Sequence, residues 1–237
     1  MTVPTDLGRR SPIYRELERR GATFGEIGGA AMAMAMGADE GAEIAAARRL
    51  GFADLSPMVR SGYKGTGTLG WVRDQDQAVP EANNAALAWS DGTVIARLAD
   101  TEVLLLGGFD GADAGHRGLA AAWAEARPEM CFPVPRADMN AEVLISGAQA
   151  PAMLAKLCAV DLRPRAFPDH GVAQTVLAGL DAVVLRADLG RTPAYRIVFD
   201  IASARYLWRC IDDAAMEFAG APVGLAALRH LAAEIEG

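Results

Sequence analysis

Strand and helix patterns follow one another in a fixed order after residue 140, and this order constrains the fold more than any other feature of the chain. Apolar runs of strand length occupy residues 142–146, 172–177, 182–186 and 195–199. The segment Gly179-Leu180-Asp181, between the second and third runs, is typical of a hairpin turn. These runs predict strands that pair in an antiparallel manner with their neighbours in the sequence.

Three other stretches of the second half have apolar residues at helical spacing, at residues 149–157, 203–218 and 225–235. The second half therefore contains a strand, a helix, three strands and two helices, in that order. Such an order predicts an α+β fold, with antiparallel sheets that carry their helices on one face.

The first half shows a similar mixture of patterns with less regularity. Helices are predicted after Ser11-Pro12, over residues 39–50 and over residues 116–127. Strand patterns at residues 93–98 and 102–106 flank Asp100-Thr101, which indicates a hairpin. Residues 61–93 have no clean period, and we interpret them as loops with one or two short strands.

Together these patterns predict two ferredoxin-like α+β halves, residues 11–130 and 131–237, within one compact unit. Residues 1–10 are expected to form a flexible tail, and they lack the apolar core of a signal peptide.

Charge and cysteine content exclude several classes of protein. The 237 residues are 51% hydrophobic with a net charge of −7, which argues against a nucleic-acid binder and against a protein held on anionic lipid. No apolar stretch is long enough to span a membrane. Cys131, Cys158 and Cys210 are widely separated, so we expect no disulfide framework and a cytoplasmic location.

Residues 65–70 (GTGTLG) match the glycine pattern of a dinucleotide site, and Asp91 follows about twenty residues later. In such a site a strand precedes the glycines and a helix follows them. The flanking residues here are polar and irregular, so the motif is interpreted as a glycine-rich turn. A dinucleotide-dependent oxidoreductase stays open as an alternative.

Other candidate chemistry is sparse. His116, His170 and His230 lack partners at metal-ligand spacing, so no metal site is expected. No G-x-S-x-G nucleophile motif occurs either.

Alternation of methionine with alanine sets residues 32–36 apart. Met32, Met34 and Met36 recur with period two, which predicts a strand with one methionine-rich face. Such a face could fill the core or could form an adaptable surface for a partner or a planar ligand.

Seven segments carry a family resemblance. They are residues 11–14 (SPIY), 21–29 (GATFGEIGG), 47–58 (ARRLGFADLSPM), 145–150 (ISGAQA), 154–162 (LAKLCAVDL), 206–208 (YLW) and 222–225 (PVGL). In their order and spacing they resemble the glycine-cleavage T-protein superfamily of folate-binding proteins, which includes subunits of sarcosine oxidase. The resemblance covers most of the chain and implies the T-protein folate-binding fold.

Further segments resemble the gamma-subunit branch of sarcosine oxidase. They are residues 54–57 (DLSP), 64–65 (KG), 94–98 (VIARL), 163–168 (RPRAFP) and 195–198 (YRIV).

Two family site positions differ in this chain. Aminomethyltransferases of the superfamily carry an Asp-Asp pair whose first member is catalytic, and alignment on Arg97-Leu98 places Ser90 first and Asp91 second. A family glutamate that binds the pterin ring corresponds to Arg196, and a guanidinium offers only donors. The transferases also continue into a further β-rich domain beyond the point where this sequence ends. The resemblance therefore implies no complete catalytic site.

The resemblance implies a sarcosine oxidase gamma-like subunit of a heteromeric complex that oxidises and demethylates N-methyl amines. The role would be structural, with a link to tetrahydrofolate one-carbon metabolism. Flavoprotein and folate-type subunits would be its partners, and the flavin would lie on them. The alternative is a stand-alone tetrahydrofolate-dependent aminomethyl or methyl transferase-like protein. Its candidate folate contacts are Asp91, Tyr195 and Arg229.

Overall fold

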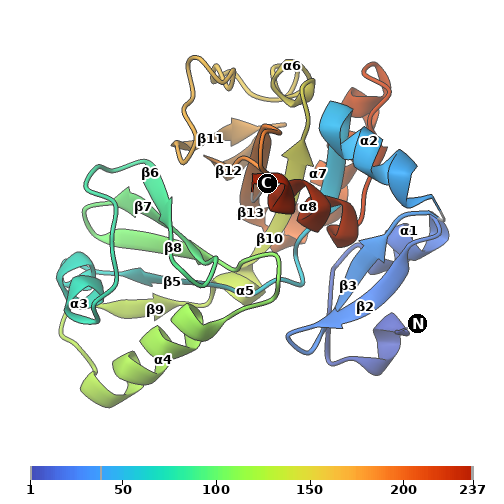
Figure 1. Ribbon diagram of the computed structural model, residues 1–237. Coiled ribbons are helices and arrows are strands. Elements are labelled where there is room, and N and C mark those ends of the chain that lie inside the picture. Colours follow the sequence, from blue (N-terminus) through green and yellow to red (C-terminus); the bar gives the residue numbers. More distant parts are fainter. Residues whose placement is uncertain (1, 38, 236–237) are drawn as a thin grey trace.

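The strands form three sheets in the computed structural model, which describes residues 2–37 and 39–235 (Figure 1). Sheet A has the order β1 (Arg9–Arg10), β3 (Ala30–Ala35), β2 (Thr23–Ile27). Sheet B has the order β11 (Val172–Leu177), β12 (Leu180–Arg186), β13 (Ala194–Asp200), β10 (Asn140–Ser146), β4 (Gly51–Asp54), β14 (Ala221–Pro222). Sheet C has the order β6 (Ala85–Ala88), β7 (Val94–Ala99), β8 (Glu102–Leu106), β5 (Arg60–Lys64), β9 (Phe132–Val134).

Eight α-helices and three short 3₁₀ segments accompany these sheets in the described part of the chain. The α-helices are α1 (Tyr14–Arg19), α2 (Glu40–Leu50), α3 (Thr68–Asp74), α4 (Ala114–Ala126), α5 (Arg136–Met139), α6 (Ala150–Leu154), α7 (Ala204–Met216) and α8 (Leu225–Ala232). The 3₁₀ segments are η1 (Pro4–Asp6), η2 (Ile201–Ser203) and η3 (Ala233–Ile235). None of the described helices has the length and apolar character needed to cross a membrane.

Sheet B separates two environments, because successive residues of a strand point to opposite faces. On one face Tyr195 and Phe199 pack with α7, where Trp208 meets Phe52 edge-on at 5.0 Å between ring centroids. On the other face Val198 packs against sheet C. Arg196 belongs to this second face, so β13 directs a charged side chain toward the space between the two larger sheets.

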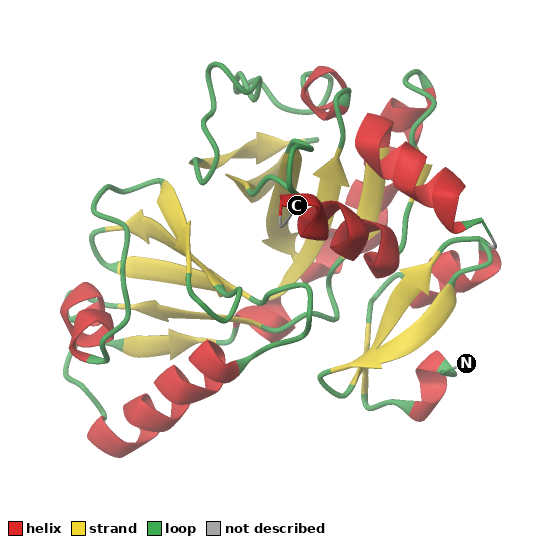
Figure 2. Cartoon of the chain, viewed as in Figure 1, coloured by secondary structure: helices red, strands yellow, loops and turns green. Residues whose placement is uncertain are grey.

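Sheet C is also covered on both faces. Ile95, Val103 and Leu105 pack with Leu119 of α4 and with residues of α3. Val94, Leu104 and their neighbours pack against sheet B. Helices α3 and α4 therefore lie on the far side of sheet C, whereas α2, α7 and α8 surround sheet B (Figure 2). Short helix α5 contacts β5 of sheet C and β10 of sheet B.

Two strands join parts of the chain that are distant in sequence. Strand β4 of the first half pairs antiparallel with β10, and β14 pairs parallel with β4. Conversely, β9 of the second predicted half pairs with β5 of the first at the edge of sheet C. Strand β1 at Arg9–Arg10 pairs parallel with β3. The two larger sheets thus draw strands from both predicted halves, and the division at residue 130 stays a prediction.

Most local predictions are confirmed. The helix expected over residues 39–50 is α2, and Asp39 caps it by accepting a hydrogen bond from Ala42 N at 3.0 Å. The hairpin expected at Gly179-Leu180-Asp181 turns one residue earlier, at Ala178-Gly179, with positive φ at both residues, and Leu180 and Asp181 already belong to β12. The predicted α+β class with mainly antiparallel sheets is also confirmed. The interpretation of residues 61–93 as loops with short strands was incomplete, because residues Thr68–Asp74 form α3.

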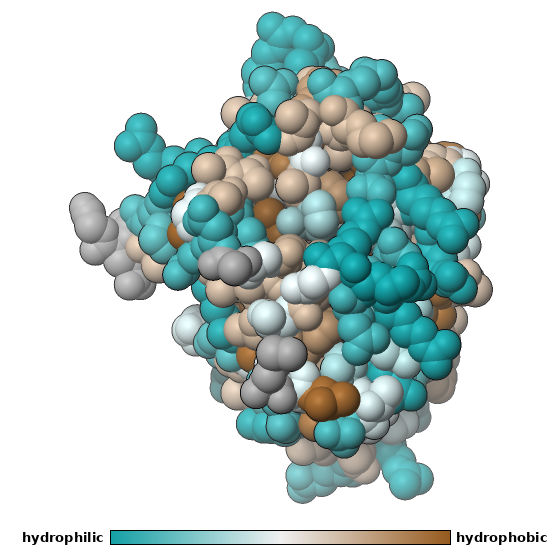
Figure 3. Space-filling view, turned by 90° about the vertical axis from the view of Figure 1, so that its right-hand side faces the viewer, coloured by the Kyte–Doolittle hydropathy of each residue, from teal (hydrophilic) through white to brown (hydrophobic). Residues whose placement is uncertain are grey.

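The methionine-rich strand is β3, and it fills the core. Met32 is buried in a cluster with α2 and α8, and Met34 packs partly buried against the same cluster. The face of the molecule that includes sheet A mixes hydrophilic and small apolar residues, and its strongly hydrophobic residues reach the surface in small separate spots (Figure 3).

Candidate functional site

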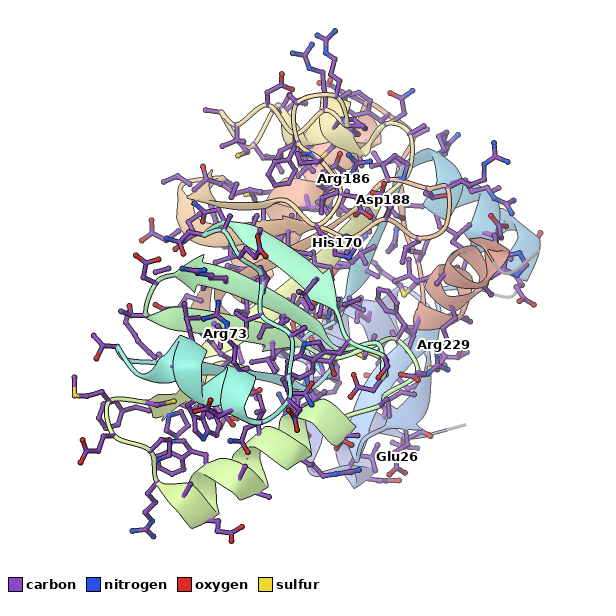
Figure 4. The ribbon with its side chains drawn as sticks, turned by 60° about the vertical axis from the view of Figure 1, so that its left-hand side comes forward. Glu26, Arg73, His170, Arg186, Asp188 and Arg229 are labelled. Carbon is purple, nitrogen blue, oxygen red and sulfur yellow. The ribbon has the colours of Figure 1, made fainter. Side chains whose placement is uncertain are left out.

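A cavity of about 530 Å³ lies where the edge of sheet C, the second face of sheet B and α8 meet. Its walls carry two arginines, Arg196 from β13 and Arg229 from α8, together with Phe109 from the loop after β8. His170 and Asp188 come from the loops before β11 and after β12, and Figure 4 shows them near each other, with Arg229 lower in the view. Side chains from five separate segments of the chain thus line one cavity.

Arg196 is held by a buried network. Its Nε donates to Glu142 Oε1 at 2.6 Å and its Nη1 donates to the Gly107 carbonyl at 3.1 Å. Glu142 is completely buried, and its second oxygen lies 3.5 Å from Nη1 of Arg60. Arg60 is buried as well and donates to five backbone carbonyls nearby. Two guanidinium groups therefore share one carboxylate in a water-poor environment.

The third nitrogen of Arg196 lacks a protein partner. Only 1% of the residue is exposed, and Nη2 makes no hydrogen bond within residues 2–37 and 39–235. The ring of Phe109 lies over the guanidinium, with 5.5 Å between Cζ and the ring centroid. Arg229 Nε donates to the Phe109 carbonyl at 2.8 Å, so both arginines fasten the loop that covers the network.

Acidic groups at the other side of the cavity already have partners. Asp188 accepts from Arg186 Nε at 2.9 Å and from Nη2 at 2.5 Å, and also from Ala194 N. His170 lies beside Asp169, and a hydrogen bond to that carboxylate raises the pKa of the imidazole above its usual value. The Asp169 carboxylate thus favours the protonated form of His170, whereas the Asp188 carboxylate is paired with Arg186.

Asp91, the first predicted folate contact, lies outside this cavity. It lines a neighbouring space of about 390 Å³ together with Ser90. Its carboxylate accepts from Thr93 N at 2.9 Å and from Gly115 N at 2.8 Å, which ties the turn before β7 to the start of α4. Burial raises the pKa of Asp91, but these hydrogen bonds outweigh burial and hold it below its usual value.

Tyr195 and Arg229, the other two predicted contacts, lie in different environments. Tyr195 is completely buried in the core beside α7, and its hydroxyl donates to the Leu162 carbonyl at 2.6 Å. Arg229 lines the cavity. The structure thus does not bring the three predicted residues together, and their role as folate contacts stays a prediction. The residues that do converge on Arg229 are Arg196 and Phe109.

The glycine-rich motif at residues 65–70 has a context that the sequence did not predict. Strand β5 precedes it and α3 follows it, so the expectation of an irregular flank was wrong. The space beside its glycines is nevertheless taken by the chain itself. A Cβ on Gly65 would lie 2.0 Å from the Met130 carbonyl oxygen, and Gly67 N donates to the same oxygen at 2.9 Å. The absence of side chains at these glycines makes room for the backbone of residues 129–131, which occupies the space that a pyrophosphate would need.

No metal site occurs among the described residues, in which no three His, Cys, Asp or Glu side chains group with suitable geometry. The cysteines are free, and Cys158 is buried in the core.

Comparison with known proteins identifies the family. A family model described as the GCVT N-terminal domain matches residues 13–236. The chain belongs to this family.

Two solved structures share the fold. The glycine cleavage system aminomethyltransferase T from Bartonella henselae has a TM-score of 0.72 and 19% identity over 95% of this chain. This chain spans only 62% of that protein's length. A chain of the heterotetrameric sarcosine oxidase from Corynebacterium sp. U-96, solved with pyrrole 2-carboxylate, has a TM-score of 0.61 and 21% identity. That match covers 76% of this chain and 92% of the other. Comparison with curated proteins gives no significant match.

The GCVT family implies tetrahydrofolate, but the residues at the Arg196 position do not fit its pterin ring. The resemblance places a pterin-binding glutamate where Arg196 stands, and the free Nη2 of Arg196 is a donor that cannot accept from the amino group of a pterin. The nearby carboxylate of Glu142 is completely buried; its Oε1 accepts from Arg196 Nε, and its Oε2 makes no hydrogen bond among the described residues but lies 3.5 Å from Arg60 Nη1. Arg196 could be singled out from the sequence by the resemblance. Glu142 could be noticed as a charge within an apolar strand pattern, whereas Phe109 carries no sequence signal.

Proposed function

We propose that this GCVT-family chain is a structural subunit of a hetero-oligomeric oxidoreductase, similar to the gamma subunit of sarcosine oxidase. The complex would oxidise and demethylate an N-methyl amine, with flavin and tetrahydrofolate carried by partner chains. The observation that carries this proposal is the buried Arg60–Glu142–Arg196 network, because it places donors where a folate carrier needs an acceptor.

The comparison with the sarcosine oxidase supports the same role. The similarity extends over 92% of a chain of that heterotetramer, so a chain of this size and fold can be one component of an assembly. Ser90 adds to this support, because a serine at the position of the catalytic aspartate offers no carboxylate charge to a reacting nitrogen.

A stand-alone tetrahydrofolate-dependent transferase is the second candidate, favoured by membership of the GCVT family. Thermal unfolding of the isolated chain with tetrahydrofolate separates the two candidates, because a ligand that binds only the native state stabilises it. The subunit proposal predicts no gain in Tm at millimolar tetrahydrofolate.

A matched pair of variants makes this experiment informative. If tetrahydrofolate raises Tm, Asp91→Ala tests the predicted contact, and Asp181→Ala, at an exposed position near the start of β12, is the control. A gain that Asp91→Ala abolishes and Asp181→Ala leaves intact would replace the subunit proposal by the transferase. NAD and NADP, tested in the same way, should also leave Tm unchanged.

A further inference from the structure

The cavity beside Arg196 has the features of a ligand site of its own. We propose that it binds a small organic carboxylate, whose oxygen accepts from Arg196 Nη2 and whose apolar body lies against Phe109 and the small residues of the wall. This inference goes beyond the subunit role and does not depend on it.

Nη2 of Arg196 is a hydrogen-bond donor without an acceptor among the described residues. A guanidinium presents its N–H groups along fixed directions in one plane. In Arg196, Nε faces Glu142 and Nη1 faces the Gly107 carbonyl, so Nη2 is left without a protein acceptor among the residues that the structure describes. A buried donor without an acceptor is costly, and native proteins seldom retain one unless water or a ligand satisfies it. A carboxylate oxygen supplies the strongest such acceptor.

The buried cluster around Arg196 has more positive than negative groups. Arg60 and Arg196 carry two positive charges against the one negative charge of Glu142. The neighbouring Asp54 does not restore the balance, because burial raises the pKa of its carboxyl and favours the neutral form. Arg229 adds a further positive charge on the cavity wall, whereas Asp110 adds one carboxylate and the other, Asp188, is already paired with Arg186. The cluster therefore favours an anion over a neutral or cationic ligand.

Part of the cavity wall is apolar. Val94, Ala88, Ala187 and Ala232 line the cavity and offer apolar contacts. A volume of about 530 Å³ lies within the usual range for small-molecule sites. A ligand with one carboxylate and an apolar body matches this combination better than inorganic phosphate, which would leave the apolar wall unused.

Phe109 controls access to the unused donor. Its ring covers the Arg196 guanidinium, and Nη2 has almost no exposed surface. The backbone at the end of this loop is fixed, because Arg196 holds the Gly107 carbonyl and Arg229 holds the Phe109 carbonyl. We therefore expect the Phe109 side chain to rotate when a ligand enters, while the loop backbone keeps its place.

Benzoate and benzamide are suitable probes for the full chain, because they share a shape and differ in charge. We expect benzoate to bind and to shift the side-chain ¹⁵N resonances of Arg196, with at least tenfold weaker binding of benzamide. Phe109→Ala should speed the association of benzoate, because the ring covers Arg196, and should weaken its binding, because the ring also contacts the apolar body of the ligand. Inorganic phosphate is the third probe.

Two variants keep the test decisive. Arg196→Met should abolish benzoate binding, but it alters the buried network, so its folding is checked by circular dichroism. Arg229→Met on the half-buried helix face should weaken benzoate binding severalfold, whereas Arg165→Met, at an exposed position that does not line the cavity, should have no effect. Equal binding of benzamide, exclusive binding of phosphate, or benzoate binding that a folded Arg196→Met variant retains would overturn the proposal. Absence of benzoate binding to the wild-type chain would do the same.

Discussion

Glu142→Gln is the substitution that tests the buried network most severely. The change keeps the shape of the side chain and removes its charge. Arg196 and Arg60 would then both lack their counter-charge, at exposures of 1% and 2%. Breaking a buried ion pair by removal of one partner costs about 3–5 kcal/mol, because the remaining charge is left uncompensated. Since two charges are affected here, we expect a loss at the upper end of this range.

Arg196→Met provides the comparison. It removes one arginine but leaves Glu142 with Arg60, 3.5 Å away. We therefore expect a smaller loss of about 1–3 kcal/mol, the cost of an under-satisfied buried group. The double variant Glu142→Leu with Arg196→Met should lose less than the sum of its single changes, because the two residues interact directly.

Urea unfolding followed by circular dichroism measures these differences as changes in the free energy of unfolding. The m-value serves as a check that each variant starts from the same compact state. A Glu142→Gln variant that loses less than Arg196→Met would refute the reasoning, because it would mean that Glu142 does not neutralise both arginines.

Three further predictions follow from other contacts. Burial lowers the pKa of His116 to about 4, with a smaller contribution from Arg196, while Asp91 and Asp113 oppose the shift. Between about pH 6.5 and pH 4 the unfolded state therefore binds more protons, so stability should fall by up to about 3 kcal/mol as the pH falls, and His116→Phe should flatten this dependence in urea titrations. Gly65→Ala should cost more than about 2 kcal/mol, since φ is +137° and the new Cβ would meet the Met130 carbonyl, whereas Gly70→Ala, with open space beside it, should be tolerated. Residues 131–237 expressed alone should show no cooperative thermal unfolding, because β4 lies between β10 and β14 in sheet B; we propose that residues 11–237 fold as one unit.

Local signals explain the parts of the fold that could be predicted. Helix α2, the β11–β12 hairpin and the β7–β8 hairpin each depend on residues close together in the sequence. Helix α3 was missed because its seven residues contain a glycine and follow a glycine-rich turn. Strand β4 was missed because its pairing with β10 joins residues about ninety positions apart, and no local period reports such a pairing.

The candidate site could be predicted only in part. The resemblance singled out Arg196, but the neighbouring Tyr195 was chosen as a ligand contact although alternation along β13 sends it to the other face of sheet B. Glu142 faces Arg196 only because β10 and β13 pair in the observed register. The convergence of Arg229 with Phe109 depends on a contact between residues that are 120 positions apart. Such contacts follow from the tertiary fold and leave no pattern in a single sequence.

Affinity purification of the tagged chain from its native host tests the central claim most directly. The account predicts that a flavoprotein and a larger folate-type subunit accompany the chain in fixed stoichiometry, with flavin absorbance in the fraction that contains all three. A chain that elutes alone, without flavin absorbance and with a gain in Tm on addition of tetrahydrofolate, would contradict the account and favour the stand-alone transferase.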